Sequence, residues 1–109
     1  MNWIILDNIQ QLEEIKQNSF NKTQLILKHS TRCIISKMAL QNFEKSYELG
    51  DEVETYFLDL ISYRSVSNTI ADVFAVEHQS PQLLIIKDGK VVFHESHEGI
   101  EASDVKKYI

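Results

Sequence analysis

The chain is poor in the residues that cross-link or punctuate a fold. Its 109 residues include one cysteine, Cys33, one proline, Pro81, and three glycines. A single cysteine cannot form a disulfide within the chain, which excludes the disulfide-rich scaffolds common among small secreted proteins. Low-complexity segments and internal repeats are absent as well. The length therefore predicts a single domain, residues 1–109, that is stabilised by an ordinary apolar core.

Long apolar runs are also missing. The longest runs, such as Trp3 to Leu6 and Leu83 to Ile86, have four residues, whereas a helix needs about 20 to cross a bilayer. The first ten residues lack the basic leader and the apolar stretch of a signal peptide. We therefore expect a cytoplasmic protein with no membrane partner.

Positive charge is scarce, because 11 lysines and arginines face 16 acidic residues and give a net charge of −5. Nucleic acids and anionic membranes require clustered positive charge, so neither is expected as the main partner. One stretch departs from this average. Between Lys28 and Lys37 the chain carries Arg32 and His29 but no acid, and Cys33 lies within this basic stretch.

Hydrophobic periodicity predicts five strands and four helices. Compact apolar runs predict strands at residues 3–6, 24–29, 53–60, 82–87 and 90–95. Helical spacing predicts helices from residue 7 to about 18, from 32 to about 49, from about 65 to 74, and over 101–109. Asp88-Gly89 between two apolar runs is typical of a two-residue antiparallel hairpin. This order predicts an α/β protein with a mixed central sheet, a C-terminal antiparallel hairpin and flanking helices.

The same patterns predict helix ends and buried faces. The expected N-caps are Asp7 with Gln10, Ser30 or Thr31, Ser65, and Ser103, and the expected stop of the second helix is Gly50. The expected apolar faces are Ile9, Leu12 and Ile15 in the first helix, Ile35, Met38, Ala39, Phe43 and Tyr47 in the second, and Val66, Ile70, Val73 and Phe74 in the third.

Cys33 falls at the start of the second predicted helix. A thiol is nucleophilic as its thiolate, and the unpaired amides and dipole of a helix N-terminus stabilise that anion. The adjoining Arg32 and the other positive charges nearby also predict a pKa below that of a free thiol. Ser36, three residues on, is placed to donate its hydroxyl to the sulfur. Free cysteines are often small buried core residues, but the polar neighbours of Cys33 favour a reactive thiol.

Pro81 is the second candidate for the site. Its fixed φ and missing amide suit the start of a strand. The Ser80-Pro81 bond is either cis, which places a rigid turn beside another element, or trans at the start of an edge strand. The sequence pattern leaves both isomers open.

These features together resemble the thioredoxin-like superfamily over essentially the whole chain: a strand, Thr-x-Cys-x-x-Ser opening a helix, and a lone Ser-Pro before a hairpin. Within it, "HSTRCIIS" at 29–36 and "VEHQSPQLLIIKDGKVV" at 76–92 resemble the bacillithiol system protein family, the monothiol bacilliredoxins. The resemblance implies that Cys33 is the attacking cysteine and that Pro81 is a cis-proline facing it.

The resemblance also implies roles for the neighbours of these two residues. Thr31 and Ser36 shape the surroundings of the cysteine, to which Arg32 adds charge, and Ser80 presents backbone groups to a bound thiol or peptide. Ile34 departs from the family, which commonly has proline directly after the cysteine. Proline there preorganises the helix and removes one amide, so the substitution bears on thiolate stability.

Family members are implicated in removing bacillithiol, a low-molecular-weight thiol, from mixed disulfides on proteins. For this chain the resemblance implies that Cys33 attacks the mixed disulfide of an S-thiolated client protein. The small thiol, bacillithiol or an analogue, is then a co-substrate and not a permanently bound cofactor. Because the chain has no other cysteine, an external thiol or a reductase must resolve Cys33.

Two other functions remain open. In the first, the chain is a non-catalytic thioredoxin-fold interaction or redox-sensing module, and Cys33 is only a modification site. In the second, Cys33 ligates an iron–sulfur cluster shared between two chains, as in monothiol glutaredoxins. Those proteins have a glycine-phenylalanine pair where this chain has Ile34 and Ile35, which disfavours the cluster.

Several polar residues have both a functional and an ordinary interpretation. His94 and His97 form a candidate metal pair, but a spacing of three on a strand places them on opposite faces, so no metal site is expected. His78 either serves the thiol site or is a solvent-facing loop residue. Tyr63 and Arg64 are interpreted as a turn residue and a surface cation.

Overall fold

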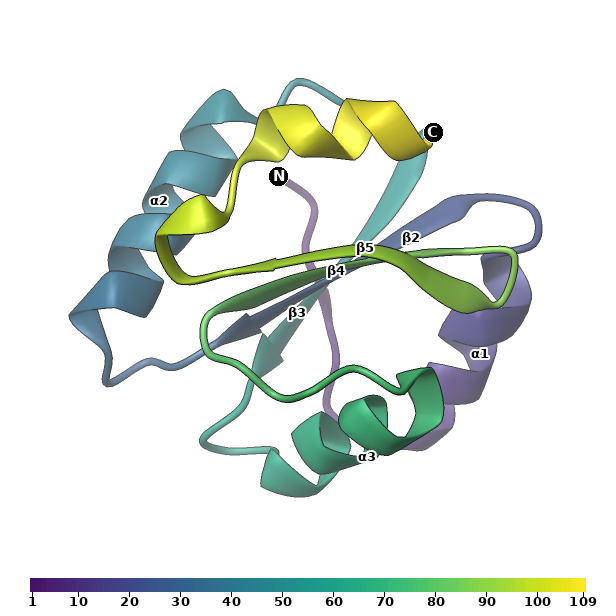
Figure 1. The fold of residues 1–109 in the computed structure, drawn as a ribbon, viewed down its shortest axis with the longest axis horizontal. Coiled ribbons are helices and arrows are strands. Elements are labelled where there is room, and N and C mark those ends of the chain that lie inside the picture. Colours follow the sequence, from purple (N-terminus) through teal and green to yellow (C-terminus); the bar gives the residue numbers. More distant parts are fainter.

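A five-stranded mixed sheet forms the centre of the protein (Figure 1). The computed structural model describes residues 1–109 except for the side chain of Glu98. Its elements are β1 (Ile4–Ile5), α1 (Gln10–Asn18), β2 (Thr23–His29), α2 (Ile34–Ser46), β3 (Val53–Asp59), α3 (Arg64–Phe74), β4 (Gln82–Lys87), β5 (Lys90–Ser96) and the 3-10 helices η1 (His97–Gly99) and η2 (Ala102–Tyr108). The predicted α/β architecture and the order of its elements are confirmed.

The strands lie in the order β1-β3-β2-β4-β5. β1, β3 and β2 are parallel, whereas β4 is antiparallel to β2 and β5 is antiparallel to β4. β2 is therefore the central strand, and each of its seven residues is buried. The segment that follows β2 leaves the sheet at the carboxyl end of this strand, which is a usual place for ligand sites in open α/β sheets.

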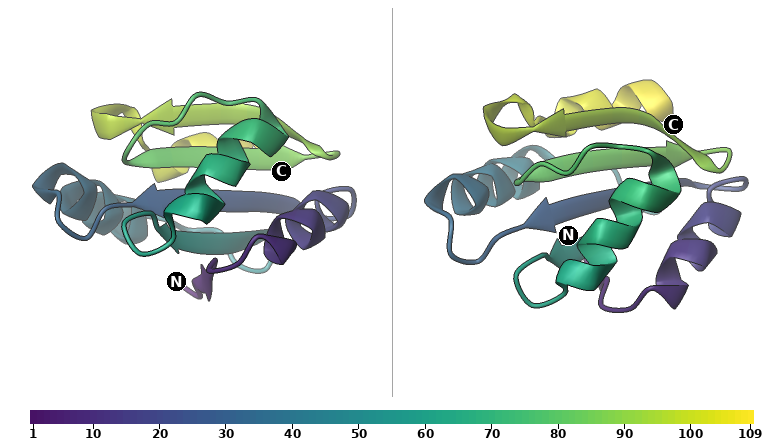
Figure 2. Two further views of the ribbon diagram at one scale, coloured as in Figure 1. Left: turned by 90° about the horizontal axis from the view of Figure 1, so that it is seen from below. Right: turned by 60° about the horizontal axis from the view of Figure 1, so that its bottom comes forward.

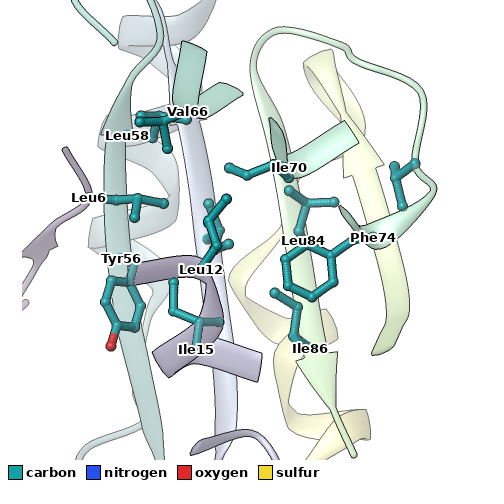
Figure 3. Packing of buried hydrophobic residues seen from close by; sticks show 12 residues of the cluster. Leu6, Leu12, Ile15, Tyr56, Leu58, Val66, Ile70, Phe74, Leu84 and Ile86 are labelled. Atoms are coloured by element: carbon teal, nitrogen blue, oxygen red, sulfur yellow. The ribbon is translucent and has the colours of Figure 1, made fainter. Parts of the chain in front are cut away.

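Helices cover both faces of the sheet. α1 and α3 lie on one face, and α2 and η2 lie on the other (Figures 1 and 2). Figure 3 shows the core beneath α1 and α3, where Leu12 and Ile70 pack with Leu84 of β4. A second core lies beneath α2 and includes Leu27 and Phe43. None of the helices in the described chain is long and apolar enough to cross a membrane.

The buried face of α2 differs from the predicted one. Ile35 and Met38 are 43% and 57% exposed, whereas Ser36, Ala39 and Phe43 are buried. Ala39 and Phe43 of the predicted face are thus confirmed as buried, but the buried face extends toward Ser36 and not toward Ile35 and Met38. The prediction rested on hydrophobic periodicity, which does not count serine among the buried residues, so the burial of Ser36 was missed. Apolar side chains consequently face solvent close to Cys33.

Several predicted caps were wrong by one or two residues. For α1 the residues are Asn8 and Gln11, not Asp7 and Gln10: Gln11 donates its backbone N–H to Asn8 Oδ1 (3.2 Å), and Gln11 Oε1 accepts from the backbone N–H of Asn8 (3.1 Å). The reciprocal capping is thus the predicted type, shifted along the chain. Ile9, the predicted core residue beside this cap, is 48% exposed.

The other helix ends also differ from the predictions. Cys33 itself is the N-cap of α2, Tyr63 is the N-cap of α3, and Glu101 precedes η2. Ser65 and Ser103 therefore lie inside their helices. Gly50 lies beyond the end of α2, and Val73 of α3 is 46% exposed.

The predicted hairpin is confirmed. Asp88 and Gly89 both have positive φ, 54° and 81°, as a two-residue type I′ turn requires. The turn is held against the end of α1, because Asp88 N–H donates to Ser19 O (3.0 Å) and Gly89 N–H donates to Ser19 Oγ (2.8 Å).

We predict that Gly89→Ala destabilises the protein and that Gly50→Ala does not. Alanine at a φ of +81° incurs a backbone cost of about 1–2 kcal/mol. An added Cβ at Gly50 meets no described atom within 4 Å, so its effect should stay within about 0.5 kcal/mol. Urea unfolding of both variants measures the difference, and equal losses of stability would contradict this account of the turn.

Candidate thiol site

Cys33 is positioned by the passage from β2 to α2. A turn follows the strand, in which Cys33 N–H donates to Ser30 O (3.2 Å). Cys33 then adopts an extended backbone (φ −106°, ψ 124°) as the N-cap of α2, and its carbonyl accepts the helical hydrogen bond from Lys37 N–H (3.1 Å). This geometry places the side chain of Cys33 beside the unpaired amides of the first helical turn.

The surroundings lower the pKa of the Cys33 thiol. The largest cause is the backbone amide of Ser36, followed by the amide of Ile35, and the hydroxyl of Ser36 makes a smaller contribution. Amides that point at the sulfur stabilise the thiolate and not the thiol. Cys33 is a free, partly exposed cysteine, so the stabilised sulfur is also accessible.

Ser36 is fully buried one turn into α2. Apart from its contribution at the sulfur, its hydroxyl has no hydrogen-bond partner within the described part of the protein. A buried hydroxyl without a partner is unusual, and here it leaves the Ser36 hydroxyl free to donate to a thiolate.

Only part of the expected patch of positive charge around Cys33 is formed, because Arg32 and Lys37 are exposed but two other residues of the basic stretch are not. Lys28 and His29 are both buried, and they point to opposite faces of β2 because side chains alternate along a strand. Lys28 lies on the α3 side, where its Nζ donates to Ser67 O (3.2 Å). The ring of His29 packs against Phe57, with centroids 5.1 Å apart, and burial lowers its pKa. Backbone amides therefore replace side-chain charge as the main support of the thiolate.

The Ser80-Pro81 bond is cis, which is the isomer that the family resemblance implied. Lys28 of β2 pairs with Gln82 of β4, so Pro81 lies one residue beyond this pair, at the end of β2 that leads to Cys33. Figure 2 shows the segment entering β4 and the β2–α2 loop at the same end of the sheet. Pro81 is buried, and its carbonyl accepts from His97 N–H (3.0 Å).

The other candidate residues lie at the same end of the molecule. Thr31 and Arg32 are exposed in the turn before Cys33, and Ser80 is partly exposed beside Pro81. The geometry thus brings Cys33 and Ser36 into contact range, with the predicted site-shaping residues in the adjoining turns. Their roles remain predictions.

An apolar surface beside the sulfur was missed by sequence analysis. Ile34, directly after Cys33, is 72% exposed, and Ile35 and Met38 are exposed as well. A hollow next to them is lined by Ile35, Met38, Ala39, Asn42, His97 and Ile100. The available signal was Ile34, a bulky apolar residue at the helix start that lies outside the predicted apolar stripe.

His78 has a contact that sequence analysis did not anticipate. Its ring is exposed, but Nδ1 lies 3.3 Å from Lys28 Nζ and 3.3 Å from Ser67 Oγ. Burial and the nearby charges of Lys28 and Arg64 lower its pKa. His94 and His97 are exposed, and among the side chains that the structure describes no three potential ligands are grouped to hold a metal ion.

Comparisons with known proteins agree with this geometry. Residues 4–105 match the family described as monothiol bacilliredoxin BrxC. A thioredoxin-fold protein assigned as an oxidoreductase is 32% identical, with a TM-score of 0.81 over 95% of this chain and 90% of the other.

More distant structures share the fold alone. Thioredoxin Mala s 13 of Malassezia sympodialis is 18% identical, with a TM-score of 0.74 over 97% and 86% of the two chains. Mitochondrial thioredoxin 3 of Saccharomyces cerevisiae is 16% identical, with a TM-score of 0.69 over 96% and 91%. The family match and the 32% identical neighbour also support a thiol redox function. With its thioredoxin fold and its match over residues 4–105, the chain belongs to the monothiol bacilliredoxin family.

Proposed function

We propose that the protein is a monothiol thiol-disulfide oxidoreductase that removes a low-molecular-weight thiol, bacillithiol or an analogue, from protein mixed disulfides. The observation that carries the proposal is an accessible cysteine at a helix N-terminus, with its pKa lowered by two backbone amides. A lowered pKa increases the fraction of Cys33 that is present as the attacking thiolate at a given pH. The lack of a second cysteine in the chain fits a one-cysteine cycle.

The first step is thiol-disulfide exchange at Cys33. The Cys33 thiolate attacks the sulfur of the small thiol in the mixed disulfide of a client protein. A new disulfide forms between Cys33 and the small thiol, the client disulfide breaks, and the client cysteine leaves as a thiolate that takes a proton from water. The number of disulfides is unchanged, so no oxidant or reductant is needed.

The second step requires another thiol. An external small thiol, or a cysteine of a partner reductase, attacks the disulfide on Cys33 as its thiolate and forms a new disulfide with the bound small thiol. Cys33 leaves as the thiolate that the amides of Ser36 and Ile35 stabilise. A stable thiolate is a good leaving group, so the same two amides support both steps.

Client recognition is proposed to use the surroundings of the sulfur. The exposed Ile34, Ile35 and Met38 offer apolar contact to residues that flank a client cysteine. Ser80 and Pro81, at the same end of the sheet, are proposed to present backbone groups to the bound thiol or peptide. Thr31 and Arg32, exposed in the turn before Cys33, are proposed to shape the surroundings of the sulfur.

The direct test uses client peptides that carry bacillithiol, glutathione or coenzyme A as a mixed disulfide. We expect the protein to release at least one of these thiols and to carry it transiently as a mass adduct on Cys33, whereas Cys33→Ser should release none. Mass spectrometry with quenching measures both. Absence of release from all three, together with a Cys33 pKa near the ~8.5 of a free thiol, would favour the non-catalytic module instead.

We predict that Ser36→Ala raises the pKa of Cys33 only part of the way toward that of a free thiol, because the backbone amides, which are the larger causes, remain. A higher pKa means a smaller thiolate fraction, so alkylation by iodoacetamide should slow below the pKa and not above it. The rate as a function of pH measures the shift. Ser46→Ala, at the exposed end of the same helix, is the matched control, and an equal shift in both variants would contradict the assigned role.

We predict that Ile34→Pro leaves the pKa of Cys33 nearly unchanged. The amides that act on the sulfur belong to Ser36 and Ile35, and proline at position 34 removes neither. Cys33 already has the extended backbone that a residue before proline prefers. The substitution should therefore also raise the free energy of unfolding, by about 0.4–1 kcal/mol. Alkylation as a function of pH and urea unfolding measure the two effects, and a clear rise in the pKa would show that the amide of Ile34 contributes.

A further inference from the structure

Lys28 is a buried cation that the proposed chemistry does not use. It lies on the central strand β2 with an exposed fraction of 0%, and burial lowers its pKa to about 8. Its Nζ lies 3.2 Å from Ser67 O and 3.3 Å from His78 Nδ1. A buried ammonium is costly and is tolerated when hydrogen bonds satisfy it. These contacts join β2 to α3 and to the segment after α3.

That segment, residues 75–81, connects α3 to β4 and ends with Pro81. Its start is fixed by the end of α3, where Val76 N–H donates to Ala71 O (3.3 Å). Its middle is held from the sheet by two residues: Lys28 contacts His78, and Gln82 Nε2 donates to Glu77 O (3.0 Å).

The two anchoring residues are neighbours in the sheet. Lys28 and Gln82 are register partners across β2 and β4, so their side chains share the face that α3 covers. Both are buried, with exposed fractions of 0% and 1%. The middle of the segment is thus attached to one point on the sheet.

The Lys28–Gln82 pair is close in the chain to both parts of the thiol site. Cys33 follows Lys28 by five residues through the end of β2, and Pro81 directly precedes Gln82. The carbonyl of Pro81 in turn accepts from His97 N–H at 3.0 Å. Only residues 79 and 80 separate His78, which contacts Lys28, from Pro81.

We propose that Lys28 is a positioning residue of the thiol site: its ammonium, bound to Ser67 and His78, fixes segment 75–81 and thereby the place of Pro81 at the end of β2. The effect of Lys28 on clients rests on the proposed function. The effect of Lys28 on segment 75–81 does not depend on that function. Lys28 acts on client engagement and not on the sulfur, because the thiolate is stabilised by amides of α2.

The test compares four variants of the full chain. Lys28→Met removes the donor while keeping an unbranched apolar chain. His78→Ala removes the acceptor at an exposed residue, so it tests the same contact even if Lys28→Met fails to fold. His78→Asn keeps an oxygen acceptor near the position of Nδ1. Glu77→Ala, an exposed residue of the same segment whose carbonyl bond to Gln82 remains, is the matched control.

Three measurements are made on each variant. Hydrogen exchange of the His97 amide, which donates to Pro81 O, reports on the segment without any substrate. We expect this exchange to be faster by about three- to tenfold in Lys28→Met and His78→Ala, as for the loss of one hydrogen bond. The KM for a bacillithiol-modified peptide should rise by a similar factor, while kcat and the pH profile of alkylation by iodoacetamide stay within about twofold of the parent protein. His78→Asn and Glu77→Ala should resemble the parent protein.

Two results would overturn the inference. One is unchanged exchange of the His97 amide in both Lys28→Met and His78→Ala. The other is a shift in the alkylation profile as large as the change in KM, because Lys28 would then act on the sulfur. If the parent protein releases no small thiol at all, the proposed function fails, and the exchange measurement alone still decides whether Lys28 fixes the segment.

Discussion

The burial of β2 on both faces is the constraint on which the rest of the structure depends. Because the strand is central, its alternate residues pack against two different layers of helices. Leu25 and Leu27 face the core under α2, and Ile26 faces the core under α1 and α3. The chain can leave this strand only at its end. Cys33 therefore lies beyond the carboxyl end of this central strand, at the start of α2, where backbone amides without partners are available.

Stabilisation by backbone amides explains why the site depends little on nearby charged side chains. The basic stretch around Cys33 suggested electrostatic support, but Lys28 and His29 lie on a strand whose two faces are both covered, so both side chains are buried. The amides of Ile35 and Ser36 are present whatever their side chains are. This accounts for a lowered pKa of Cys33 in a chain whose net charge is negative. The amide of Ile34 is not one of the causes, so isoleucine at position 34 is compatible with the lowered pKa.

The fold and the position of Cys33 were predictable because they follow from local signals. Strand runs, the Asp88-Gly89 turn and the polar start of a helix each need only a few neighbouring residues. The buried face of α2 was not predictable in this way, because a buried Ser36 and an exposed Met38 reflect how the helix lies on the sheet. The contact between Lys28 and His78 joins residues 50 positions apart. Alternation along the strand predicts that Lys28 and His29 lie on opposite faces of the sheet, but it does not predict a contact with His78.

A cation in the core requires a reason beyond stability. An apolar residue of similar volume at Lys28 would avoid the desolvation of an ammonium and often costs nothing in stability. An apolar side chain, however, makes no directional bonds. The Lys28 ammonium has acceptors on α3 and on segment 75–81, and these hydrogen bonds define the distance and the direction of the segment relative to β2. Placing the charge on the strand that leads to Cys33 makes one residue a common reference for both parts of the site. In the cycle proposed above, such a reference keeps the position of Pro81 the same through both exchanges at Cys33.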